Sequence, residues 1–140
     1  MPLVEFPRRP FGRTGLSVAP LGLAGSYGID ADATERAFHE LSINYFFVTP
    51  RMKGLCEGLR RLIKAGHRDK LVLATGPFFP TGAALRSVWE ELTRSLGTDY
   101  VDVLQTFWVR WRWYLTGNTI ATLRRFKTEG KIRNVHRREM

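Results

Sequence analysis

The sequence predicts an α/β chain built on a parallel sheet. Short apolar segments alternate along the chain with segments whose apolar residues recur at helical spacing. The apolar segments return about every 25–30 residues, which is typical of strand–helix–strand units with parallel strands. They contain few polar positions, as in strands covered on both faces. With 140 residues, 44% of them hydrophobic, the chain has the size of a single domain spanning residues 1–140.

The first segment, residues 1–18, is expected to form a β-hairpin. Proline and glycine punctuate it, and Gly12-Arg13-Thr14-Gly15 supplies a turn in which glycine tolerates positive φ. Four strands are expected to follow, with a fifth just beginning near the end of the sequence. The expected strands are residues 18–23, 43–48, 71–75, 100–106 and 131–135.

Four helices are expected between these strands. Each contains apolar residues at helical spacing, most follow a polar residue able to cap the first turn, and glycine closes the later ones. The expected helices run from Asp30 or Asp32 to Leu41, over 51–65 before Gly66, over 83–96 after Thr81, and from Thr116 or Asn118 to Gly130.

The net charge is +9, and most of it lies in the last quarter of the chain. Residues 106–140 hold 9 basic and 2 acidic side chains, interleaved with Trp108, Trp111, Trp113 and Tyr114, and they end in a basic tail at 136–140. Cations beside aromatic rings suit nucleic acids. A solvated basic face is the commoner meaning, and no known nucleic-acid motif is present, so we do not expect a nucleic-acid partner.

Several other classes of protein are excluded or disfavoured. No apolar run approaches the ~18–20 residues that cross a bilayer, and the N-terminus lacks the order of a signal peptide. A single cysteine, Cys56, excludes an internal disulfide. His39, His67 and His136 lie far apart in the sequence and show no metal-ligand spacing. We therefore expect a cytoplasmic protein without membrane contact or a metal site.

Four segments carry a more specific signal. Phe11-Gly12-Arg13-Thr14-Gly15-Leu16-Ser17-Val18 with Leu21-Gly22-Leu23, Ile43-Asn44-Tyr45-Phe46, Ser95-Leu96-Gly97-Thr98-Asp99-Tyr100-Val101-Asp102, and Glu129-Gly130-Lys131-Ile132-Arg133-Asn134-Val135 occur in this order. Together they resemble the hairpin and the first strands of the aldo-keto reductases. That family folds as a (β/α)8 barrel. The resemblance implies half of a TIM barrel, made of an N-terminal β-hairpin plus about four βα units.

The resemblance also identifies four positions where the family carries its catalytic Asp, Tyr, Lys and His. This sequence has Phe47, Met52, Gly76 and Phe107 there. Carbonyl reduction needs a proton donor near the substrate oxygen, and none of these four side chains can supply one. Family members bind NADPH largely through the second half of the barrel, which this sequence does not match. We therefore expect no cofactor and no reductase chemistry at the family positions.

In such barrels the functional groups lie at the carboxyl ends of the strands. Here those ends are aromatic with cations close behind, which suits an apolar or anionic small molecule. The alternative is that the aromatic side chains fill the barrel mouth or face a partner subunit. The candidate pocket residues are Tyr27, Phe47, Arg51, Met52, Lys53, Phe78, Phe107, Trp108 and Arg110.

Four functions remain open on this basis. The first is a binding or interaction module that has lost the family's reaction. The second is a non-redox enzyme, such as an isomerase, lyase or cyclase, that uses Arg51, Lys53 or Arg110 to stabilise charge. The third is residual NADPH-dependent carbonyl reduction, and the fourth is a truncated product.

Half a barrel leaves an open sheet edge and an apolar face, so a homo-oligomer, most simply a two-fold dimer, is expected.

Overall fold

The computed structural model describes residues 6–107 and 115–137, and side chains as far as Val135. Two strands form an antiparallel hairpin, and five others form a parallel sheet in the order β3-β4-β5-β6-β7. The strands are β1 Arg9–Pro10, β2 Ser17–Val18, β3 Leu23–Ala24, β4 Tyr45–Phe47, β5 Val72–Thr75, β6 Val101–Thr106 and β7 Ile132–Arg137. The helices are α1 Ala31–Leu41, α2 Lys53–Lys64, α3 Gly82–Leu96 and α4 Gly117–Thr128, with a short 3-10 helix, η1, at Arg68–Lys70.

The order of elements confirms the predicted α/β chain. Each of the four helices connects two neighbouring parallel strands, as in successive βα units. Within the described residues, no helix has the length and apolar character that a membrane span needs.

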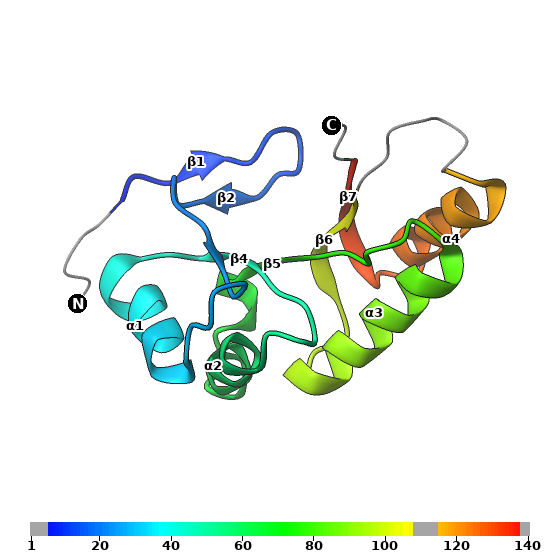
Figure 1. Ribbon diagram of the computed structural model, residues 1–140. Coiled ribbons are helices and arrows are strands. Elements are labelled where there is room, and N and C mark those ends of the chain that lie inside the picture. The colour runs from blue at the N-terminus through cyan, green and yellow to red at the C-terminus, as the bar shows by residue number, and fades with distance from the viewer. Residues whose placement is uncertain (1–5, 108–114, 138–140) are drawn as a thin grey trace.

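The helices cover one face of the sheet, and the hairpin lies on the other (Figure 1). Alternate residues of a strand point to opposite faces, so Phe46 is fully buried while Tyr45 and Phe47 are partly buried on the other side. The core between sheet and helices is mostly leucine: Leu55, Leu59, Leu62, Leu73, Leu85, Leu92, Leu96 and Leu104.

The predicted strands 43–48, 71–75 and 100–106 are each shorter by one to three residues, and the first and last strands of the sheet differ in other ways. The predicted strand 18–23 is divided, because Val18 belongs to β2 and the sheet begins only at Leu23. Pro20 has no N–H to donate, and the N–H of Ala19 donates to the Asn44 side chain at 2.8 Å. The second difference is in β7, whose backbone includes His136 and Arg137 of the segment expected to be a tail.

Side-chain caps fix the helix starts that the sequence left open. Asp30 Oδ1 accepts the N–H of Ala33 at 2.7 Å, so Asp30 rather than Asp32 caps α1. Thr116 Oγ1 likewise accepts the N–H of Thr119 at 3.3 Å and caps α4.

Asn44 attaches the hairpin to the sheet. Its Nδ2 donates to the carbonyl of Ser17 at 2.9 Å, while its Oδ1 accepts the N–H of Ala19. The ring of Phe11 packs on Tyr45 with centroids 5.2 Å apart. The hairpin is therefore fixed over the start of β4.

Candidate functional site

An aromatic pair occupies the carboxyl ends of the middle strands. Phe47 is the last residue of β4, and Phe107 follows β6 directly. Their ring centroids are 5.4 Å apart at an angle of 85°, an edge-to-face contact. These are two of the positions at which the family resemblance implies polar catalytic groups. Here they form an apolar contact instead.

Gly76, directly after β5, leaves no space for a side chain. A β-carbon there would lie 2.3 Å from the carbonyl oxygen of Gln105 and 2.6 Å from Cε2 of Phe107. The first contact is with the backbone of the neighbouring strand, so turning the Phe107 ring would not relieve it. The position at which the family carries its lysine therefore accepts only glycine in this structure.

Met52 has a packing role. It precedes the first residue of α2 and is partly buried against the core. Its β-carbon is only 2.9 Å from where a β-carbon on Gly25 would lie. Met52, at the position where the family carries its catalytic tyrosine, thus packs the start of α2 against the segment after β3.

The remaining candidates lie at the surface or outside the described residues. Arg51, Lys53 and Tyr27 are exposed, and Phe78 is 74% exposed with its ring 5.9 Å from Phe79. Trp108 and Arg110 lie outside the described residues. The structure therefore brings Phe47 and Phe107 together over Gly76. The expected role of Arg51, Lys53 and Arg110 around a pocket stays a prediction.

A cavity of about 510 Å³ lies between the hairpin and strands β3 and β4. Of the candidate residues, Phe47 contributes to its wall. The other lining residues are mostly apolar and include Phe11, Val18, Leu23 and Tyr45. This space fits an apolar group.

Tyr45 and Gln105 are polar groups near this cavity that the sequence did not single out. The amide of Gln105 donates to the Tyr45 hydroxyl at 3.4 Å. Burial raises the pKa of Tyr45, and the bond from Gln105 offsets part of that rise. A phenol with a raised pKa holds its proton, so Tyr45 is a poor general acid near neutral pH.

The fold brings His39 and His67 together, although they are distant in the sequence. Their ring centroids are 5.4 Å apart, and both rings contact Phe38. In the part of the chain that the structure describes, no group of three or more potential ligands is placed to hold a metal ion.

Solved structures similar to this chain include aldo-keto reductases. One from Pseudomonas aeruginosa is 25% identical with a TM-score of 0.72, and the match covers 94% of this chain and 60% of that one. Another, from Bacillus halodurans, is 24% identical with a TM-score of 0.71 and is covered over 51% of its length. The chain has the fold of half an aldo-keto reductase barrel.

This aldo-keto-reductase-like chain spans little more than half the length of those solved structures. No family model matches it, and no curated protein matches its sequence. The predicted half of a (β/α)8 barrel is confirmed by the strand order and by these similarities.

Proposed function

We propose that this aldo-keto-reductase-like chain is a binding or interaction module that does not reduce carbonyl compounds. The supporting observation is the closed apolar arrangement of Phe47, Gly76 and Phe107 at the strand ends. Carbonyl reduction needs a hydride donor on one side of the carbon and an acid at the oxygen. The phenylalanine rings provide no acid, and the contacts of Gly76 leave no space for a lysine.

The side chains at these strand ends do not fit a nicotinamide-dependent reduction. The edge of the Phe107 ring lies 2.6 Å from a β-carbon built on Gly76, where a polar side chain would have to begin. We therefore derive no chemical step through NADPH. The cavity beside Phe47 instead favours an apolar small molecule or an apolar side chain of a partner.

A fluorescence titration with NADPH tests this proposal. We expect no saturable change in NADPH fluorescence on adding the protein, while a complete aldo-keto reductase gives one in the same buffer. Saturable NADPH binding by the wild type, with an affinity that changes in Phe47→Asp or Phe107→His, would contradict the proposal. The cofactor would then be bound at these strand ends.

We further propose that the chain forms a homodimer. Strands β3 and β7 are the edges of the parallel sheet, and exposed strand edges pair readily with another chain. Apolar side chains are exposed near both edges, with Leu21 at 54% and Val135 at 43%. A second copy bound there would cover them.

Light scattering after size-exclusion chromatography tests this assembly. We expect twice the mass of one chain, and we expect Val135→Lys to shift the population toward monomer. Ile120→Lys is the matched control, because Ile120 is similarly exposed, at 37%, but lies on helix α4 and not on a strand of the sheet. A folded monomer at every concentration would rule out the dimer.

A further inference from the structure

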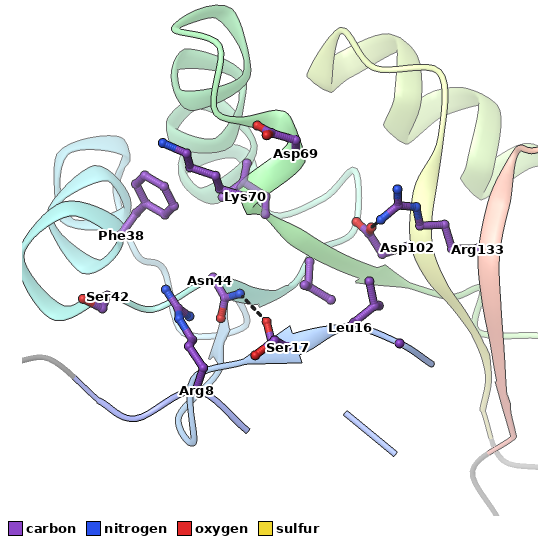
Figure 2. Close-up of a pocket in the computed structure, with 13 residues that line it drawn as sticks. Arg8, Leu16, Ser17, Phe38, Ser42, Asn44, Asp69, Lys70, Asp102 and Arg133 are labelled. Atoms are coloured by element: carbon purple, nitrogen blue, oxygen red, sulfur yellow. Dashed lines mark hydrogen bonds and ion pairs between the residues drawn. The ribbon is translucent and has the colours of Figure 1, made fainter. Parts of the chain in front are cut away.

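A second cavity lies at the opposite end of the sheet from the aromatic pair. It has a volume of about 420 Å³, and Figure 2 shows the residues that line it. Segments far apart in the sequence form its wall, namely the hairpin, the end of α1, the start of β4, η1, β6 and β7. Its size is in the range of small-molecule sites.

One side of this cavity carries a buried carboxylate whose negative charge is balanced by neighbouring guanidinium groups. Asp102 is 1% exposed. Its Oδ2 accepts a hydrogen bond from the N–H of Leu73 at 2.9 Å and forms an ion pair with Nη2 of Arg68, also at 2.9 Å. Its Oδ1 lies 3.6 Å from Arg133, a residue that also lines the cavity. Two guanidinium groups therefore face one buried carboxylate.

The other side carries two cations, Arg8 and Lys70, for which the described part of the chain provides no ion-pair partner. Figure 2 shows Arg8 and Lys70 on the side nearest Phe38 and Ser42, with Asp102 and Arg133 across the cavity. Among the described residues, no carboxylate is within 4.0 Å of Arg8 or Lys70. The one further acidic residue in the wall is Asp69, which is exposed.

The charges in the wall therefore leave an excess of positive charge. Arg8, Lys70 and Arg133 stand against Asp69 and Asp102, and Asp102 is also paired with Arg68 from outside the wall. The wall also contains the apolar side chains of Leu16, Leu71 and Phe38. A ligand that joins an anionic group to an apolar part can therefore contact both the cations and these side chains.

We propose that this cavity binds a small organic anion, such as a phosphate or carboxylate attached to a ring or short alkyl chain. The anionic group lies between Arg8 and Lys70, and the apolar part contacts Leu16, Leu71 and Phe38. Asp69 opposes the anion and reduces its affinity. This site is separate from the strand ends on which the proposed function depends.

Phenyl phosphate is the probe for this site, followed by backbone NMR shifts of the intact chain. We expect saturable shifts at Ser42 and Lys70 that weaken as salt is added. Arg8→Gln and Lys70→Gln should each weaken binding about threefold to tenfold, as expected for one charge-assisted contact. Asp69→Asn should tighten binding.

Two controls separate this site from general attraction to a basic protein. Lys64→Gln removes an exposed cation at the end of α2, outside this cavity, and should leave the affinity unchanged. Inorganic phosphate and benzyl alcohol should each bind more weakly than phenyl phosphate, because the first lacks the ring and the second lacks the anionic group. Absence of saturable shifts in the wild-type chain, or equal losses in Lys64→Gln and Lys70→Gln, would overturn the proposal.

Discussion

The tight packing around Gly76 is also the reason for proposing that the chain has lost carbonyl reduction. The backbone after β5 approaches the carbonyl of Gln105 so closely that any β-carbon collides with it. The sequence predicted the absence of the four polar groups, because the resemblance assigned those positions one by one. It did not predict that Phe107 would cover Gly76, since that contact joins strand ends about thirty residues apart and depends on how the strands pair.

We predict that Gly76→Ala lowers the free energy of unfolding by about 2 kcal/mol, because its β-carbon overpacks a buried contact. Chemical denaturation measures this change. Gly117→Ala is the control, since a β-carbon at Gly117 has nothing within 4 Å, and it should leave stability unchanged or raise it by up to about 1 kcal/mol. Equal stabilities of Gly76→Ala and the wild type would mean that the strand ends are open.

The pH dependence of stability has a predictable sign at Cys56. Burial raises the pKa of this thiol, whose Sγ donates to the carbonyl of Thr49 at 3.4 Å. The unfolded chain therefore loses the thiol proton first as pH rises. The contribution of Cys56 to stability is complete below the ordinary thiol pKa of about 8.5 and is lost as pH rises through the higher native value.

Urea unfolding of the wild type and of Cys56→Ala, each at several pH values from neutral to alkaline, tests this prediction. The wild type should lose more stability than the variant over the alkaline range. Tyr45, whose pKa burial also raises, contributes equally to both proteins and cancels in the comparison. Parallel pH profiles would show that the native and unfolded thiols titrate alike.

At the level of the elements, local chemistry explains what the sequence analysis predicted correctly, and a contact between distant segments explains its main error. Helices α1, α3 and α4 begin at side-chain caps, and α2, α3 and α4 each end within two residues of a glycine, so their positions were predictable within a few residues. The first sheet strand was misplaced because apolar content alone cannot divide 18–23 between hairpin and sheet. That division depends on Asn44, which binds Ser17 and Ala19 from 25 or more residues away.

The cap of α1 gives a test at this level. Asp30→Ala should lower the free energy of unfolding by about 1 kcal/mol, because the N–H of Ala33 loses its acceptor. Asp32→Ala is the matched control, since Asp32 forms an exposed ion pair with Arg61 and does not cap the helix. It should cost less than Asp30→Ala, and the reverse order would assign the cap to Asp32.

For the whole molecule, the half-barrel was predictable because the family-like segments follow one another in the same order as the strands. Aromatic side chains at the strand ends were predicted, with a filled barrel mouth as one alternative, but the edge-to-face contact of Phe47 with Phe107 was not. The cavity at the other end of the sheet, whose described lining has more basic than acidic side chains, was not predicted either. Both depend on contacts between distant segments, which a pattern of local periodicity does not contain.

The most direct test of the account is carbonyl reduction itself. NADPH absorbance is followed with the purified chain and a series of aliphatic and aromatic aldehydes, beside a complete aldo-keto reductase as the positive control. We predict no aldehyde-dependent loss of NADPH above the rate without protein. Aldehyde-dependent oxidation of NADPH that is proportional to the amount of this chain, and that changes in Phe107→Ala, would contradict the account.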